Sequence, residues 1–204
     1  MLPIEGEMSL EAVLTRVSQL QTAMAPQAVP IQRGTNFGQV LNTASANLNS
    51  VSGVAPLGGG TVGQKMVALA QKEIGVKEEP MGSNDGARIK EYRTATAGSG
   101  VGPWCAYFTS WLAKSAGAPV GEAGQGFGSV DALYAWAQRT GKAVQNGPGV
   151  TPQPGDLIVW DEHIGMVESV DADGTVHTIE GNSSDQVIRR THSQSSALGY
   201  VKMS

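Results

Sequence analysis

Two apolar stripes with helical spacing lie near the start of the chain. The first recurs at intervals of three and four residues after Ser9, a residue type that commonly begins a helix, and the second follows a break at residues 26–34. The first contains Leu10, Val13, Leu14, Val17, Leu20 and Met24, and the second Phe37, Val40, Leu41, Ala44, Leu48 and Val51. Each stripe needs a partner surface. Either the two helices pack on each other or on the main domain, or they form a docking or export segment that orders only within an assembly.

A stretch of small residues separates these stripes from the rest of the chain. Residues 52–62, "SGVAPLGGGTV", combine glycine and proline with no charge, as flexible linkers do. We therefore predict a small helical segment at 1–51, a linker at 52–62 and a main domain at 63–204.

Helical periodicity dominates the first half of the main domain. The expected helices cover 63–74, 87–92, 105–116 and 130–140, the last begun by Ser129, with Gly75, Gly117 and Gly141 as stops.

The pattern then changes to short strands, expected at 154–160, 163–170, 175–181, 186–190 and 198–203, and "DADG" at 171–174 is a hairpin turn signal. Helices first and antiparallel strands afterwards predict an α+β fold, a sheet with helices on one side.

Composition narrows the function. The 204 residues carry a formal net charge of −4 and no run of Lys or Arg, which argues against a nucleic-acid partner. No segment approaches the ~20 apolar residues of a membrane helix, so we expect no membrane span. Residues 1–25 lack the pattern of a secretory signal. We therefore expect synthesis in the cytoplasm, and a route other than general secretion if the protein works outside.

The single cysteine, Cys105, is the first candidate for chemistry. It stands in "PWCAYFTSWLAKSAG" (103–117), where a glycine-rich loop gives way to a helical pattern. A helix start favours a thiolate by roughly 0.3–1 kcal/mol, which is too little on its own, so a reactive thiol also needs a cationic neighbour. The alternative is that Cys105 is a small buried core residue.

The predicted hairpin decides which histidine can be that neighbour. With 171–174 as the loop, His163 lies opposite Asn182, and strand alternation puts Glu180 and Asn182 on its face. His177 points to the other face. A bulge or a three-residue loop would reverse this parity. Parity alone leaves open whether Glu180 or Asn182 orients the imidazole.

A thiol hydrolase needs this combination of groups. The thiolate attacks a carbonyl carbon, the imidazole later protonates the leaving amine, and a polar group fixes the ring's orientation. The backbone N–H of Cys105, at the helix start, is available to stabilise the oxyanion. The glycine-rich loops at 94–103 and 121–128 are the expected rims of a cleft.

Three stretches together resemble a known family. "PWCAYFTSWLAKSAG", then "QPGDLIVW", then "HIGMVESVDADGTVHTIEGN" are similar to the CHAP family of cysteine, histidine-dependent amidohydrolases and peptidases, papain-like enzymes that cut bacterial peptidoglycan. The resemblance covers about residues 63–204 and leaves the N-terminal stripes unexplained. It implies a papain-like α+β fold with helices packed on an antiparallel sheet.

The resemblance also assigns roles. It implies that Cys105 is the nucleophile, His163 the general base and acid, Glu180 the orienting residue and Asn182 a supporting polar group. Tyr92 resembles a tyrosine that papain-like wall peptidases place beside the thiol, where it would contact substrate. One departure is the residue before the histidine, which is often Gly in the family and is Glu162 here.

Several other residues are candidates for binding roles. Trp104 is either a cleft wall that contacts glycan or peptide or part of the core. His177 and His192 have no partner at ligand spacing, so we expect no metal site, and His192 is expected at the surface. "GQGFG" at 124–128 lacks the context of a phosphate-binding loop. We expect no cofactor, because the thiol and imidazole supply the chemistry.

The sequence therefore predicts a hydrolase that cleaves an amide bond in the peptide part of peptidoglycan and acts on the cell wall. The alternative is a phage or appendage assembly protein whose hydrolase-like domain only binds the wall, and a third interpretation is a general protease. Residues 37–51 faintly resemble the N-terminal pieces of flagellar rod-type proteins. The N-terminal stripes are therefore candidates for contact with secretion, flagellar or phage machinery.

Overall fold

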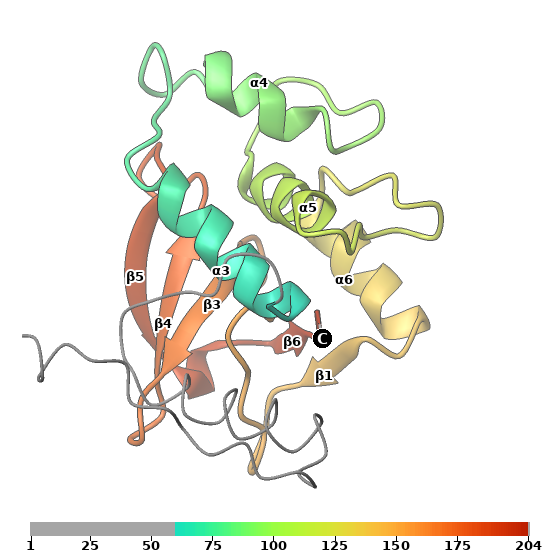
Figure 1. Ribbon diagram of the computed structural model, residues 1–204, viewed down its shortest axis with the longest axis vertical. Coiled ribbons are helices and arrows are strands. Elements are labelled where there is room, and N and C mark those ends of the chain that lie inside the picture. Colours follow the sequence, from blue (N-terminus) through green and yellow to red (C-terminus); the bar gives the residue numbers. More distant parts are fainter. Residues whose placement is uncertain (1–59, 204) are drawn as a thin grey trace, which may run out of the picture. The chain divides into compact units, whose positions relative to one another are not determined.

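The structure, a computed structural model, describes residues 60–203, so both N-terminal stripes and most of the predicted linker lie outside the described part. Helices come first along this region and strands follow (Figure 1). The helices are α3 (Val62–Glu73), α4 (Ala87–Arg93), α5 (Cys105–Ser115) and α6 (Val130–Arg139). The strands are β1 (Ala143–Gln145), β2 (Leu157–Val159), β3 (Ile164–Val170), β4 (Thr175–Glu180), β5 (Ile188–Ser193) and β6 (Gly199–Val201), with the 3-10 helix η1 (Gln194–Ser196) between β5 and β6.

The helix ends follow from local sequence. Thr61 caps α3 in a capping box, accepting from the Gln64 backbone while the Gln64 side chain accepts from Thr61. Helix α3 thus starts at Val62, the last residue of the predicted linker. Ser129 caps α6 through a 3.3 Å bond from the Ala132 N–H. No helix within residues 60–203 has the length and apolar character needed to cross a bilayer.

The strands within residues 60–203 all join one antiparallel sheet in the order β1-β6-β2-β3-β4-β5. The sequence pattern missed β1, which has only three residues and pairs with β6 at the edge. Strand β2 is buried at all three positions, as its continuous apolar run indicates.

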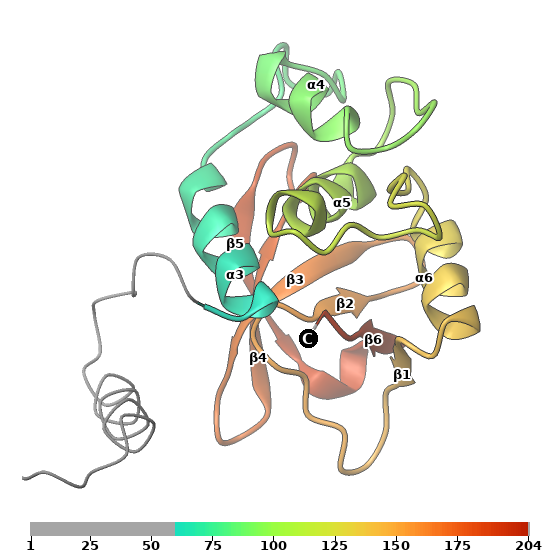
Figure 2. The same ribbon diagram turned by 45° about the vertical axis from the view of Figure 1, so that its right-hand side comes forward.

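The helices pack on one face of the sheet. In Figures 1 and 2, α3 and α5 lie over the region of β3, and α6 lies beside β1. The core on this face joins apolar residues of all four described helices to alternate residues of the strands, among them Met66, Ile89, Phe108, Leu112, Leu133, Met166 and Ile179. A smaller cluster covers the opposite face and contains Ile158, Val167, Val176, Ala197 and Tyr200. The predicted papain-like α+β fold, with helices on an antiparallel sheet, is confirmed.

The β3–β4 hairpin reaches the predicted parity by two irregularities that cancel. Near the turn Val170 pairs with Val176, one residue away from the expected register. A bulge between Val167 and Ser169 then shifts the register back, so Val167 pairs with Thr178. The same register, extended one pair beyond Met166 and Ile179, places Gly165 opposite Glu180. Both residues lie on the face of the hairpin that the sequence predicted for His163.

Candidate active site

Cys105 is the first residue of α5 and lies at the edge of a surface groove. Its side chain is 4% exposed, and the groove that it lines has a volume of about 240 Å³. The N–H groups of a first helical turn have no acceptor within the helix, and they point toward the space in front of it. The thiol is therefore not sealed in the core, and it faces the positive end of the α5 dipole.

The groove is bordered by the two loops that the sequence predicted as rims. Pro103 comes from the loop before α5 and Gly128 from the loop before α6. The full lining is Pro103, Cys105, Tyr107, Gly128, Ser129, Val130, Asp131, Asp161 and Glu162. Its only ionisable groups besides Cys105 and Tyr107 are acidic, so the groove favours substrates that carry positive charge near the thiol.

His163 is positioned by a tight hairpin between β2 and β3. The Trp160 N–H donates to the His163 carbonyl at 2.9 Å, which closes the turn around Asp161 and Glu162. The Trp160 ring stacks on the imidazole, with ring centroids 5.6 Å apart and planes inclined by 25°. The histidine is thereby held in place through both its backbone and its ring.

The imidazole connects Glu180 to the cysteine. Its Nε2 is 2.9 Å from Glu180 Oε2, which leaves Nδ1 as the ring nitrogen free to serve the thiol. Burial alone would lower the pKa of His163, but the neighbouring Cys105 thiol and then the hydrogen bond and charge of Glu180 raise it to about 9. The Cys105 and His163 side chains are thus close enough to interact, although they form no regular hydrogen bond among the described side chains. At neutral pH this environment favours an imidazolium.

Glu180 is the buried centre of the arrangement. It is 2% exposed, and besides His163 it accepts from Thr178 Oγ1 at 2.5 Å and bonds to His192 Nε2 at 2.6 Å, both at Oε1. Burial would raise the pKa of Glu180, but its bonds to His163, Thr178 and His192 lower it to about 2. The carboxylate therefore stays ionised at neutral pH.

Gly165 leaves the space that this carboxylate occupies. A Cβ added to Gly165 would lie 2.8 Å from Glu180 Cγ and 3.5 Å from its Cδ. Any side chain at this position would displace Glu180 from the path to His163. This requirement for a glycine comes from close approach and not from backbone conformation.

Tyr92 and Trp104 were the two residues expected to contact substrate, and the structure shows that neither can do so. Tyr92 and Trp104 are each 0% exposed and stack on one another, with centroids 5.9 Å apart. The Tyr92 hydroxyl donates to Glu73 at 2.7 Å, and the Trp104 Nε1–H donates to Glu78 at 2.9 Å. Burial and the bond to Glu73 raise the pKa of Tyr92 well above its usual range. Neither ring offers a surface to substrate, so both are core residues that support the start of α5.

The other candidates have distinct places. Asn182 follows β4 in a left-handed conformation (φ 59°), and its side chain forms no hydrogen bond within residues 60–203. Glu180, and not Asn182, is thus the residue bonded to the imidazole. His177 bonds to Asp171 at 2.7 Å, away from this network. Glu162 is exposed in the groove wall and forms no bond to His163.

Sequence reasoning missed two aromatic partners of the site. For Trp160 the stretch "WDEH" (160–163) holds a signal, because residues that flank a two-residue turn are cross-strand neighbours. His192 was expected at the surface, but it bonds to Glu180 and lies 4.5 Å from the Trp160 ring, centroid to centroid. No signal indicated this contact, since His192 pairs across the sheet with Val176 and not with Glu180.

No group of side chains within residues 60–203 has the composition and spacing of a metal site. The chemistry that the site can support on its own is that of a thiol and an imidazole, with a carboxylate behind them. A cysteine at a helix start and a histidine beside an antiparallel sheet form the arrangement that is found in papain-like cysteine hydrolases.

A comparison with protein-family models points to one family within this class. The family model of the CHAP domain matches residues 96–182, which include Cys105, His163 and Glu180, so this part of the chain is similar to that family. The family is generally one of amidase- and peptidase-type hydrolases with peptidoglycan as substrate. No curated protein matches the chain.

Proposed function

We propose that the protein is a cell-wall hydrolase that cleaves an amide bond in the peptide part of peptidoglycan through a Cys105 thiolate. One observation carries the proposal: His163 shares its environment with Cys105 on one side and bonds to the buried Glu180 on the other. A histidine with a pKa of about 9 is protonated at neutral pH and can stabilise a thiolate beside it.

In the first half of the reaction, the Cys105 sulfur attacks the carbonyl carbon of the amide. The C–N bond then breaks, the His163 imidazolium donates its proton to the leaving nitrogen, and a thioester and a free amine result. The Cys105 N–H, at the start of α5, is available as a donor to the oxyanion.

In the second half, water attacks the thioester carbon and His163 takes its proton. The C–S bond breaks, a carboxylic acid leaves and gives its remaining proton to solvent, and the thiolate–imidazolium pair is restored. Glu180 keeps the imidazole oriented in both halves, because its Oε2 holds Nε2 while Nδ1 exchanges the proton. No redox step or cofactor enters this proposal.

Release of soluble fragments from purified peptidoglycan tests the proposal. Wild-type protein should release fragments, and Cys105→Ala should release at least about a hundredfold less while it still sediments with the wall. Equal release by the two proteins would refute a thiol mechanism. Sedimentation of both without release by either would favour the binding-only assembly module. Digestion of casein at a comparable rate would favour a general protease.

We also propose that residues 1–51 direct the enzyme to its place of action, because their two apolar stripes need a partner surface. Removal of residues 1–55 should abolish localisation to the wall in cells and leave activity on purified peptidoglycan within about twofold. Unchanged localisation without this segment would refute the addressing role. The control for chain length is full-length protein in which residues 10–24 are scrambled, because it keeps the length and composition of the segment and removes the spacing of the first apolar stripe.

A further inference from the structure

His192 makes a contact that the proposed mechanism does not use. Its Nε2 lies 2.6 Å from Glu180 Oε1, while His163 holds the other carboxylate oxygen. The buried carboxylate therefore lies between two imidazoles. The Trp160 ring packs against both, at centroid distances of 5.6 Å from His163 and 4.5 Å from His192.

This contact limits how the Glu180 side chain can turn. A glutamate side chain has three rotatable covalent bonds. A single hydrogen bond from Oε2 to His163 would therefore leave the Oε1 end of the carboxylate free to change its position. His192 and Thr178 both hold Oε1. Thr178 lies on the same strand two residues before Glu180, whereas His192 approaches from β5 and ties the carboxylate to a second strand.

We infer that His192 is a positioning residue for the hydrolysis. By holding Glu180 Oε1 from β5, it presents Oε2 to His163 and keeps Nδ1 directed at Cys105. This inference rests on the proposed function, and it extends the Cys105–His163–Glu180 set by a fourth member.

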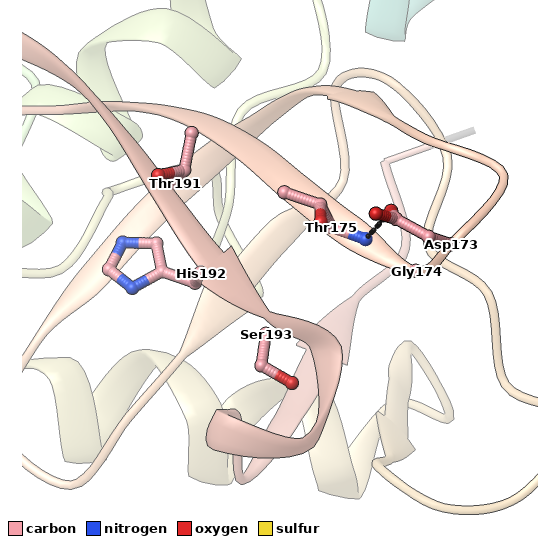
Figure 3. Close-up of a pocket in the computed structure, with 6 residues that line it drawn as sticks. All are labelled: Asp173, Gly174, Thr175, Thr191, His192 and Ser193. Atoms are coloured by element: carbon pink, nitrogen blue, oxygen red, sulfur yellow. Dashed lines mark hydrogen bonds between the residues drawn. The ribbon is translucent and has the colours of Figure 1, made fainter.

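The surroundings of His192 show which other groups act on its ring. Its side chain is 27% exposed and lines an open groove of about 280 Å³ with Asp173, Gly174, Thr175, Thr191 and Ser193 (Figure 3). Asp173 is the only other ionisable group in this lining. Its carboxylate accepts from the Thr175 N–H at 2.9 Å, as the dashed line in Figure 3 marks. The charged and titratable partners of His192 in the described network are thus Glu180 and, across the Trp160 ring, His163.

Three substitutions isolate the donor at this position. His192→Gln keeps an N–H near the place of Nε2, His192→Asn keeps an amide that is too short to reach Glu180, and His192→Leu removes the donor. His177→Leu is the matched control, since His177 also bonds a carboxylate through Nε2 but lies outside the network. Thermal unfolding of each variant reports whether it folds.

The first readout is the pH dependence of Cys105 alkylation by iodoacetamide, followed by intact mass. Cys105 is the only cysteine, so the product is unambiguous and no peptidoglycan is needed. The alkaline limb of this profile is the change in alkylation rate that occurs as the His163 imidazolium loses its proton. We expect His192→Leu and His192→Asn to move this limb to lower pH by about half a unit or more, because a Glu180 carboxylate that is no longer held in place stabilises the imidazolium less well. His192→Gln and His177→Leu should retain the wild-type profile.

The second readout is hydrolysis of peptidoglycan fragments. His192→Leu and His192→Asn should lower kcat by about tenfold with KM within about twofold, as expected when a reacting group is misplaced. A variant that is partly unfolded would contain less active enzyme at every pH. Its pH profile of hydrolysis would therefore be lower throughout, with the alkaline limb at the same pH. Profiles of His192→Leu and His192→Asn that match wild type would overturn the inference, as would a His192→Gln variant as impaired as His192→Asn. If wild type hydrolyses nothing, the proposed function fails, and the alkylation profile still decides the role of His192.

Discussion

Replacing Glu180 with glutamine removes the charge behind His163 and keeps the size of the side chain. Glutamine retains a carbonyl oxygen that can accept from His163 Nε2, while the Thr178 hydroxyl and the Nε2 of a neutral His192 can accept from the new amide. The imidazole should therefore stay in place while its charged form loses a partner. The change tests the electrostatic role of Glu180 apart from its packing.

The size of the effect follows from the pKa of His163. Its rise from 6.5 to about 9 corresponds to about 3 kcal/mol, which the Cys105 and Glu180 contributions achieve against the cost of burial. If Glu180 supplies about half of this net rise, its loss lowers the pKa of His163 by about 1 to 1.5 units, or about 1.5 to 2 kcal/mol. The imidazolium that protonates the leaving amine would then be lost near pH 8 instead of pH 9.

The assay is the pH profile of kcat/KM on peptidoglycan fragments between pH 6 and 10. For Glu180→Gln we expect an alkaline limb about one unit lower, with activity at pH 8.5 reduced by about threefold relative to wild type. Glu122→Gln, the same change in an exposed ion pair with Arg139, is the control and should leave the limb in place. An unshifted limb in an active Glu180→Gln variant would refute the role given to this carboxylate.

Three further predictions follow from the same contacts. Gly165→Ala should lower kcat by at least about tenfold with the fold retained, because its Cβ meets Glu180 Cγ at 2.8 Å, and activity equal to wild type would contradict the close approach. Tyr92→Phe should leave kcat/KM within about twofold and lower the free energy of unfolding by about 1 to 2 kcal/mol in urea titrations, since it removes a buried bond to Glu73; a large loss of activity at unchanged stability would restore Tyr92 to the site. His163 has a higher pKa in the folded than in the unfolded chain, so its contribution to stability is fully present below pH 6.5 and is lost as pH rises through about 9. The urea midpoint should therefore fall over this range in wild type and fall less in His163→Gln, and equal falls would contradict the raised pKa.

The elements that the sequence predicted well are those with local signals. Helix α6 has a serine cap and a glycine stop, and α3 and α5 have glycines in the left-handed region just beyond their ends. Strand β1 has neither alternation nor a turn signal, and its three residues are held by pairing with β6. Its formation depends on the rest of the sheet, which a local pattern does not contain.

The site shows the same division between local and distant contacts. Pairing arithmetic across one hairpin placed Glu180 on the correct face, although a shifted turn and a bulge had to cancel for this to hold. The connection from β4 to β5 is too long for its sequence to fix how the two strands pair. The approach of His192 to Glu180 could therefore not be predicted. Burial of Tyr92 and Trp104 depends on how α3 and α4 pack on α5. The substrate role of Tyr92 came from the family resemblance, and the position of Trp104 next to the cysteine left both a cleft wall and the core open.

The most direct test of the central claim counts the groups that appear when purified peptidoglycan is digested. Cleavage of an amide by the Cys105 thiolate exposes one new amino group per bond and no new reducing sugar end. We predict that wild-type protein raises the amino-group count with time while reducing ends stay constant, and that Cys105→Ala changes neither. Amino-group release by Cys105→Ala at the wild-type rate would contradict the account, as would a rise in reducing ends alone.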